Sequence, residues 1–205
     1  MTTITGITLD VPDTAAAKTF YDKAFGLDDR LRFRTAEQPT AGFRGFVLSL
    51  VVADPGVVDS LIHPALDAGA TELKPVKKSF WGYGGVIQAP DGAIWKVATS
   101  NKKASGAPAR QVDDIVLLIG ADDVAASKKF YVDHGLDVAK SFGRKYVEFA
   151  SASDSVKLAL YGRRAAAKDA GVDADGSGSH RVIVGSAGES FTDPDGFVWE
   201  PTATT

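Results

Sequence analysis

The sequence predicts an α+β protein built of tandem βαβββ modules, with mixed or antiparallel sheets and helices packed outside them. Three observations lead to this class. Alternating apolar and polar residues predict strands, and apolar residues at helical spacing predict helices between the strands. Both kinds of segment occur twice along the chain in the same order, which indicates an internal repeat.

Two pairs of related segments show this repeat. AAAKTFYDKAFGLD at 15–28 is related to AASKKFYVDHGLD at 125–137, and QAPDGAIWK at 88–96 is related to TDPDGFVWE at 192–200. The repeat divides the chain into a first half at 1–99 and a second half at 112–205. The segment between them, SNKKASGAPARQ at 100–111, has the composition of a solvated linker.

The first half opens with ITGITLDV, which alternates like a strand, and Asp13 or Thr14 can cap the helix that follows. The apolar face of this helix consists of Ala17, Phe20, Tyr21 and Ala24. Strands at LRFRT and FVLSLVV, a helix near 56–68 and two strands joined by a turn at 89–92 complete the half. In that turn Pro90 presets its backbone φ angle and Gly92 accepts a positive φ.

The second half repeats a strand and a helix at 112–134. The later elements that we predict are strands at YVEFA and VKLALYG, a short Ala-rich helix at 163–170, a polar loop at 171–180, and strands at RVIVG, GESFT and GFVWE. This half lacks a counterpart of the helix near 56–68. The first half in turn is short of strands between 29 and 42, so the two halves differ in which elements they have lost.

Composition excludes several classes of function. The chain has 205 residues, 44% of them hydrophobic, and a net charge of -3, so it offers no basic footprint and we expect no nucleic-acid partner. The absence of Cys excludes disulfides and cysteine-based metal sites. No window reaches the roughly 20 apolar residues of a membrane span, and the N-terminus does not resemble a signal peptide. We therefore expect a cytoplasmic protein with no membrane partner.

The order of these motifs resembles the glyoxalase/bleomycin-resistance/dioxygenase superfamily, also called the vicinal oxygen chelate superfamily. The residues that carry the resemblance are Leu9 to Asp28, Phe80 to Ala98, Leu118 to Asp137 and Asp193 to Glu200. The resemblance implies paired modules that form a cupped sheet, with a ligand held on its concave face. In metal enzymes of the superfamily, a His or Gln on the first strand of a module and a Glu on the last strand bind a divalent ion.

The positions that correspond to these metal ligands carry few donor side chains here. First-strand positions fall on Gly6, on Val116 with Asp114 two residues earlier, and near Val47; last-strand positions fall on Lys96, Glu200 and near Leu158. Because a metal site needs three or four converging ligands, we predict that no metal cofactor is bound. The acidic set Asp114, Glu148 and Glu200 is the alternative for metal binding or general-base chemistry, against plain solvent-facing charges.

The histidines do not restore a metal site. His63 and His134 fall on helices predicted to lie outside the sheet, whereas His180 borders the final strands, where it faces either a pocket or solvent.

SFWGYGGVIQ at 79–88 is the segment most indicative of ligand binding. It combines aromatic residues, which suit a planar ligand, with glycines, which mark a close approach of ligand or backbone. A packed, Gly-kinked strand edge explains the same residues equally well. The predicted ligand-binding residues are Phe80, Trp81, Tyr83, Gln88, Lys96, Arg44, Tyr146 and Glu148. Lys96, if it faces inward, favours an anionic or carbonyl-bearing ligand, and otherwise it is a solvated surface residue.

Two functions from different classes follow. The first is a metal-independent binder of a small aromatic or hydrophobic molecule on the concave sheet, similar to the drug-sequestering members of the superfamily. The alternative is a lyase, isomerase or dioxygenase that acts on a small carbonyl or diol compound through the acidic set, or without a metal through Lys96 and Tyr83. A purely structural or partner-binding domain is a third possibility. We expect a monomer or homodimer.

Overall fold

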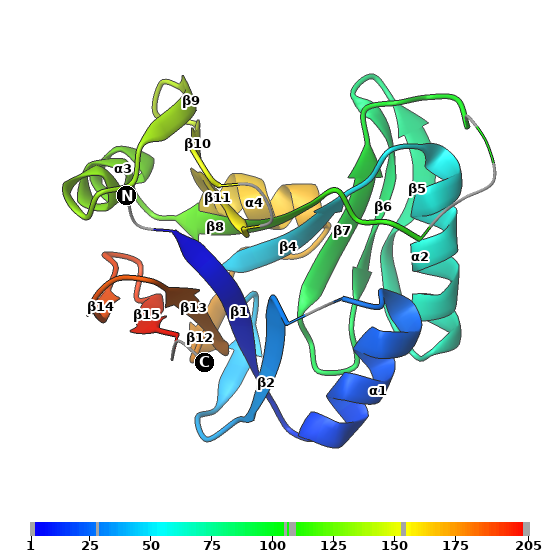
Figure 1. Cartoon of the computed structure of the whole chain (residues 1–205), viewed down its shortest axis with the longest axis horizontal. Helices are drawn as coiled ribbons and strands as arrows, with labels where there is room; N and C mark the ends of the chain where they lie inside the picture. Colours follow the sequence, from blue (N-terminus) through cyan, green and yellow to red (C-terminus); the bar gives the residue numbers. More distant parts are fainter. Residues whose placement is uncertain (1–2, 28, 105, 107–109, 153–154, 203–205) are drawn as a thin grey trace.

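The computed structural model describes residues 3–27, 29–104, 106, 110–152 and 155–202. Residues 105 and 107–109 of the predicted linker lie outside this described part. The chain forms two large sheets and one small sheet, accompanied by four helices in the described residues (Figure 1). None of the helices in these ranges is both long and apolar enough to cross a membrane.

The larger sheet has eight strands in the order β5-β6-β7-β4-β8-β11-β10-β9. Its strands are β4 (Phe46–Val51), β5 (Thr71–Ser79), β6 (Gly82–Gln88), β7 (Ile94–Thr99), β8 (Asp114–Ala121), β9 (Val138–Phe142), β10 (Tyr146–Phe149) and β11 (Lys157–Gly162). The sheet bends into a trough, with β5–β7 as one wall, β4 and β8 as the floor, and β9–β11 as the other wall (Figure 1). Antiparallel pairing of β4 with β8 joins the two halves of the sequence at the floor.

The smaller sheet has five strands in the order β14-β15-β13-β1-β2. Its strands are β1 (Ile4–Val11), β2 (Leu31–Thr35), β13 (Val182–Ser186), β14 (Phe191–Thr192) and β15 (Val198–Pro201). Here too the halves meet, because β1 of the first half pairs antiparallel with β13 of the second. A third sheet of two strands, β3 (Thr40–Gly42) and β12 (Gly176–Gly178), adds another link between them. The two halves therefore pair with each other within one chain.

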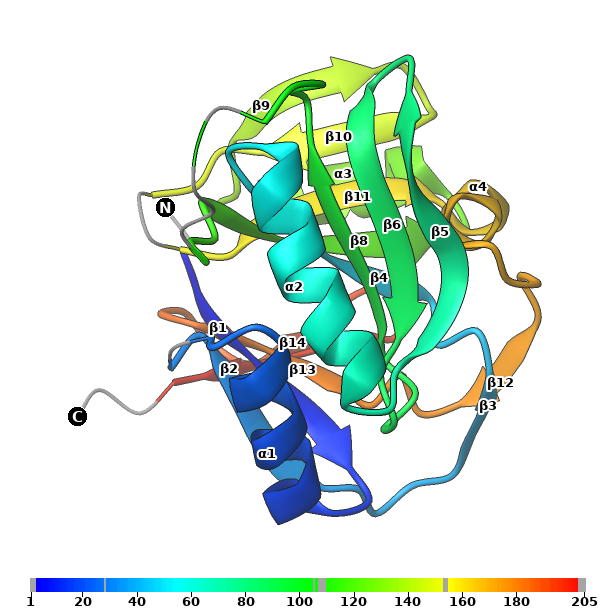
Figure 2. The same ribbon diagram turned by 90° about the vertical axis from the view of Figure 1, so that its right-hand side faces the viewer.

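Three of the four helices lie outside the sheets, as predicted. The helices are α1 (Thr14–Ala24), α2 (Pro55–Asp67), α3 (Val124–Asp133) and α4 (Arg163–Ala170). Asp13, Asp54 and Asp123 cap the first three by accepting hydrogen bonds from backbone N–H groups of the first turn. Figure 2 shows α2 covering the outer face of β5–β7.

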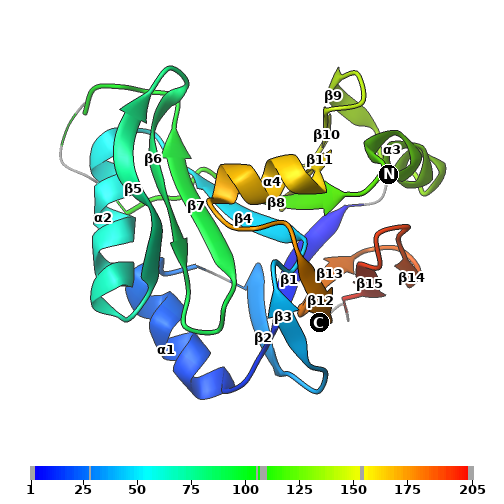
Figure 3. The same ribbon diagram turned by 180° about the vertical axis from the view of Figure 1, so that it is seen from behind.

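The fourth helix differs from the prediction that helices pack outside. It contacts β4, β8 and β11 and lies inside the trough, between its two walls (Figure 3). The physical reason is that the floor strands are apolar on both faces. Phe46 and Leu48 of β4 pack on the outer side, whereas Val47 points into the trough and is only 3% exposed. Ala166, Ala167 and Ala170 of α4 cover that inner face.

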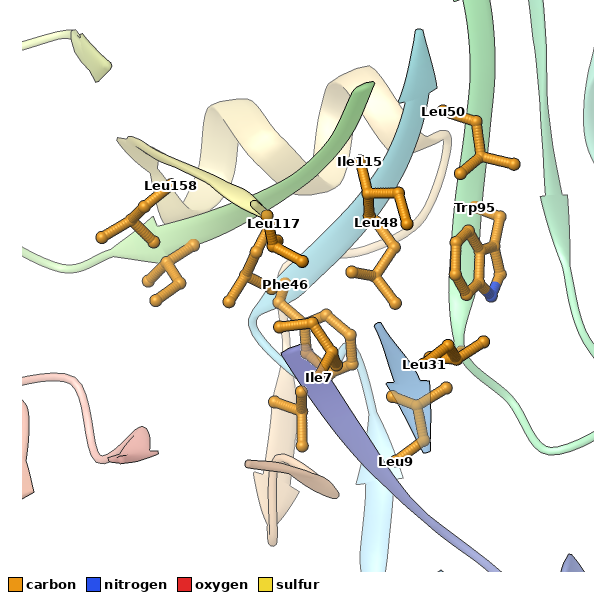
Figure 4. Packing of buried hydrophobic residues seen from close by; sticks show 14 of the residues in the cluster. Ile7, Leu9, Leu31, Phe46, Leu48, Leu50, Trp95, Ile115, Leu117 and Leu158 are labelled. Carbon is orange, nitrogen blue, oxygen red and sulfur yellow. The ribbon is translucent and has the colours of Figure 1, made fainter. Parts of the chain in front are cut away.

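The main core fills the space between the two large sheets. Figure 4 shows Ile7, Leu9 and Leu31 of the smaller sheet beside residues of the larger one. These partners are Phe46, Leu48, Leu50, Trp95, Ile115, Leu117 and Leu158. The smaller sheet and α1–α3 thus cover the outer face of the trough, whereas α4 covers part of its inner, concave face.

Most of the predicted elements are confirmed. The helix predicted near 56–68 is α2, and the Ala-rich helix predicted at 163–170 is α4. The strand predicted at LRFRT is β2. Four strands were not predicted: β3 in the region of 29–42, β5, β9, and β12 in the loop predicted at 171–180. β3 and β12 are short and pair with each other, although they lie far apart in the sequence.

Candidate functional site

The strand registers show which side chains line the concave face. Lys96 on β7 lies beside Ser49 on β4, and Ser49 lies beside Val116 on β8. Because side chains alternate between faces, residues two apart on each strand share a face. Lys96 therefore faces the interior of the trough, whereas its neighbour Trp95 is fully buried in the core on the other side.

The same registers test whether the concave face fits a metal ion. At the floor, the positions that correspond to metal ligands carry Val47, Val116 and Lys96, and none of these binds a divalent cation. Leu158 was assigned to the wrong face, since its side chain is buried in the core between the sheets.

The smaller sheet has one suitable donor at the corresponding place. Glu200 lies beside Gly185, which in turn lies beside Gly6, so the carboxylate has no partner ligand in its row. Arg34 approaches Glu200, with its Nη1 atom 3.9 Å from the carboxylate. A lone carboxylate with a guanidinium neighbour does not provide the converging ligands of a metal site.

The predicted acidic set is not brought together. Asp114 accepts a hydrogen bond from Lys157 at 2.7 Å, Glu148 lies on the far wall, and Glu200 belongs to the other sheet. In the described ranges, no group of three or more His, Asp or Glu side chains is arranged to hold a metal ion. The sequence offered these three residues as a set, but it carried no information about which strands are neighbours.

A groove on the concave face does bring together three of the predicted ligand-binding residues. Its volume is about 480 Å³, and it lies between the wall formed by β5–β7 and the end of α4. The residues that line it are Val51, Lys74, Pro75, Lys77, Ser79, Trp81, Gly82, Tyr83, Gly84, Gly85, Val86, Lys96, Ala98, Thr99, Ser100 and Asp169. We call this the wall groove. Trp81, Tyr83 and Lys96 are the predicted residues on its lining, although the Tyr83 hydroxyl points to the outer side of the wall.

The mouth of the wall groove is formed by the tip of the β5–β6 hairpin. Trp81 is 83% exposed and lines the groove, whereas the adjacent Phe80 is 81% exposed and lies outside it. The two rings meet edge to face with centroids 5.0 Å apart, and the Lys102 ammonium lies 5.6 Å from the Phe80 ring centroid. An indole with this much free surface provides an apolar platform beside the groove.

The charged end of the groove is formed by Lys96 and the last turn of α4. The Lys96 ammonium donates to the Asp169 carboxylate at 2.6 Å. Lys74 donates to the backbone carbonyls of Lys168 and Asp169 at 2.8 and 2.6 Å, where helix carbonyls lack partners within the helix. Lys96 therefore faces the interior of the trough, which was one of the two predicted alternatives. Its partner Asp169 belongs to α4, a helix that the sequence predicted but did not locate inside the trough.

The Tyr83 hydroxyl points away from the concave face, where Lys96 lies. This hydroxyl donates to the Asp59 carboxylate of α2 at 2.9 Å, on the outer side of the wall. Burial, together with this carboxylate, raises the pKa of Tyr83 above its usual value. The metal-free pairing of Lys96 with the Tyr83 hydroxyl is therefore wrong, because the two groups point to opposite faces of the sheet.

The glycines of SFWGYGG are explained by backbone packing. A Cβ atom on Gly84 would lie 2.5 Å from the Val97 carbonyl oxygen, and one on Gly82 would lie 2.0 Å from that of Thr99. Gly82 also has a φ angle of 141°, which favours glycine. Of the two explanations left open by the sequence, these contacts favour the Gly-kinked strand edge.

Arg44 and Gln88 support the turn at 89–92 instead of the wall groove. Arg44 donates to the Asp91 carbonyl, and burial lowers the pKa of its guanidinium. Gln88 donates to the Gly92 carbonyl at 3.2 Å and borders a separate polar cavity beside α4. Both residues were predicted as ligand contacts, but their polar atoms hold backbone carbonyls.

Tyr146 and Glu148 lie together on the opposite wall of the trough. The Tyr146 hydroxyl donates to the Glu148 carboxylate at 3.1 Å, and burial followed by the charge of Glu148 raises the Tyr146 pKa to about 12. Neither residue lines the wall groove. They form a polar pair of their own on the concave face.

None of the three histidines lies where it could bind a metal ion together with other ligands. His63 is exposed on α2, and His134 ends α3, where its Nδ1 atom lies 2.8 Å from the Phe130 carbonyl oxygen. His180 contacts the Arg44 carbonyl through Nδ1 and the Asp195 carbonyl through Nε2, and it stacks on Phe197 with centroids 4.0 Å apart. His180 therefore connects the two halves of the chain.

Comparison with known proteins agrees with this architecture. Glyoxalase I from Zea mays matches with a TM-score of 0.63 and 15% sequence identity, over 97% of this chain and 91% of that one. A "putative dioxygenase" from Bacillus subtilis matches with a TM-score of 0.60 and 11% identity, over 96% of this chain and 83% of that one. The chain is therefore an α+β protein of paired βαβββ modules. Its fold is that of glyoxalase I from Zea mays, in agreement with the order of the sequence motifs.

These likenesses concern the fold, because the identities are low. No family model matches the sequence, and no curated protein matches it significantly.

Proposed function

We propose that this protein is a metal-independent binder of a small aromatic or hydrophobic molecule, which it holds in the wall groove on the concave face of its larger sheet. The observation that carries the proposal is the groove itself. Val51, Val86 and Ala98 supply apolar surface beside the exposed indole of Trp81, and a few polar groups cluster at one end. A volume of about 480 Å³ falls within the range of roughly 300–1,000 Å³ typical of small-molecule sites.

Metal independence is part of the proposal and rests on the chemistry of the donor set. The floor positions hold aliphatic side chains and an ammonium group, and Lys96 is already paired with a carboxylate. An enzymatic function on a small carbonyl or diol compound would need an acid, a base or a metal near the bound molecule. No arrangement in the described part of the chain favours that alternative over binding.

Calorimetric titration tests the proposal with a matched pair of variants. The neutral probe 2-naphthalenemethanol is titrated into the wild type, Trp81→Ala and Phe80→Ala. Both substitutions remove an exposed aromatic ring from the same hairpin tip, but only Trp81 lines the groove. We expect Trp81→Ala to weaken binding about tenfold, equivalent to ~1.4 kcal/mol, and Phe80→Ala to change it less than about twofold. Equal losses in both variants, or no binding by the wild type, would contradict the proposal.

A further inference from the structure

An internal carboxylate occupies the cationic end of the wall groove. Asp169 projects from the last turn of α4 and accepts a hydrogen bond from Lys96 at 2.6 Å. The two side chains are 44% and 36% exposed, so the pair can be reached from the groove and from solvent. Among the described residues that line the groove, Asp169 is the only one with a carboxylate.

The charge of the groove differs in sign from that of the whole chain. Lys74, Lys77 and Lys96 line it together with Asp169, a local excess of positive charge in a protein of net charge -3. Asp169 also lies at the C-terminal end of α4, where the helix dipole disfavours a carboxylate. Its stable position therefore depends on the neighbouring ammonium group of Lys96.

We propose that the wall groove selects aromatic anions, and that Asp169 is an internal competitor for the cation that binds them. This inference rests on the proposed function. The ring of the ligand lies against Trp81 and the apolar surface of Val51 and Ala98, and its carboxylate takes the place of the Asp169 carboxylate on Lys96. Displacement needs little free energy, because a partly exposed ion pair contributes little net stability.

The exchange leaves the ligand with contacts that Asp169 lacks. Lys77 lines the same groove, so a mobile carboxylate can approach two ammonium groups. The released Asp169 side chain turns to water, where it is already almost half exposed. A neutral aromatic molecule gains the ring contact alone and leaves the ion pair intact, and this difference separates the two ligand classes.

The test compares 2-naphthoate with neutral 2-naphthalenemethanol by calorimetry on the full chain. We expect the wild type to bind 2-naphthoate about tenfold more tightly than 2-naphthalenemethanol. Added salt should weaken the binding of 2-naphthoate but not that of the alcohol, because salt screens the charges. Asp169→Asn should tighten 2-naphthoate binding by about threefold or more and leave the alcohol unchanged. Lys96→Met should reduce the affinity for 2-naphthoate to that for the alcohol.

Lys140→Met is the control, because Lys140 lies on β9 in the opposite wall and its loss changes the net charge equally. It should leave both affinities unchanged. Equal binding of the two probes by the wild type, or weaker binding of 2-naphthoate by Asp169→Asn, overturns the anion preference while the proposed binding function stands. The salt dependence of the wild type keeps the test decisive if a variant does not fold. Absence of binding by both probes overturns the proposed function as well.

Discussion

At the scale of single residues, two buried tyrosines connect the motifs that are repeated along the sequence. Tyr21 of α1 donates to the Asp91 carboxylate at 2.8 Å and accepts from the Trp95 indole at 3.1 Å. Tyr131 of α3 donates to the Asp193 carboxylate at 2.5 Å. In each half, the Phe-Tyr helix is thus bonded to the Pro-Asp-Gly turn.

Removing either hydroxyl should destabilise the fold. Tyr21→Phe and Tyr131→Phe each remove the hydroxyl that donates to one carboxylate oxygen, while the other oxygen of Asp91 or Asp193 keeps its backbone donors. The first variant also leaves the Trp95 N–H without its acceptor. We expect each variant to lose about 1–3 kcal/mol in the free energy of unfolding, measured by urea denaturation. Tyr161→Phe, with no hydroxyl hydrogen bond among the described residues, serves as the control and should stay within about 0.5 kcal/mol. Equal effects in all three variants would argue against these bonds.

The pair formed by Tyr146 and Glu148 gives stability a specific dependence on pH. The pKa of Tyr146 is raised to about 12 in the folded protein, against about 10 in the unfolded chain. The folded state therefore holds this proton more tightly, so the stability from Tyr146 is complete below about pH 10 and is lost as the pH rises through about 12.

Comparison of wild type with Tyr146→Phe measures this effect. The free energy of unfolding of the wild type, relative to that of the variant, should decrease between about pH 9 and about pH 12. Tyrosinate absorbance of the folded wild type should include one group with a pKa near 12 that the variant lacks. A difference in stability that does not change with pH would show that the environment of Tyr146 does not raise its pKa.

At the scale of elements, β6 is positioned by its glycines. Because a Cβ on Gly84 would lie 2.5 Å from the Val97 carbonyl oxygen, Gly84→Ala should force β6 and β7 apart and destabilise the protein by about 1–3 kcal/mol. Thermal denaturation measures the loss. Gly162→Ala is the matched control, since a Cβ there meets no atom within 4 Å. Loss of ligand affinity in Gly84→Ala without loss of stability would show that Gly84 makes room for the ligand and not for the packing of β6 on β7.

The helices and strands also show which parts of the fold and of the candidate site could be predicted from the sequence alone. Caps such as Asp13, turns such as Pro90–Gly92 and the alternation of β4 are local signals, and they predicted most of the helices and strands. The location of α4 depended on which strands meet at the floor of the trough, and that pairing joins residues far apart in the sequence. Asp169 was therefore not among the predicted ligand-binding residues, although it lines the same groove as Lys96 and Trp81, which were.

At the scale of the whole molecule, both large sheets contain strands of both halves. The core between the sheets includes Trp95 from the first half and Trp199 from the second, each fully buried. Neither half can complete a large sheet without the other, because β4 pairs with β8 and β1 pairs with β13. The repeat divides the sequence into two halves, but the two large sheets and the core between them are built from both halves together.

This arrangement predicts a single cooperative unfolding transition. Two double variants, Trp81→Phe with Trp95→Phe and Trp81→Phe with Trp199→Phe, leave one buried indole in one half as the fluorescent reporter. For each variant, we expect the midpoint of urea unfolding by fluorescence to coincide with the midpoint by circular dichroism. If the fluorescence midpoint differs from the circular dichroism midpoint of the same variant, the two halves unfold independently.

The central claim is that a small aromatic ligand binds in the wall groove beside Trp81. The most direct test is an NMR titration of the isotope-labelled protein with 2-naphthoate, observed at the three tryptophan indole N–H signals. Trp81 is 83% exposed in the groove, whereas Trp95 and Trp199 are 0% exposed. We expect the Trp81 signal to shift progressively and saturate, while the other two stay in place. A saturating titration that leaves the Trp81 signal unmoved would place the ligand elsewhere and contradict binding in the wall groove.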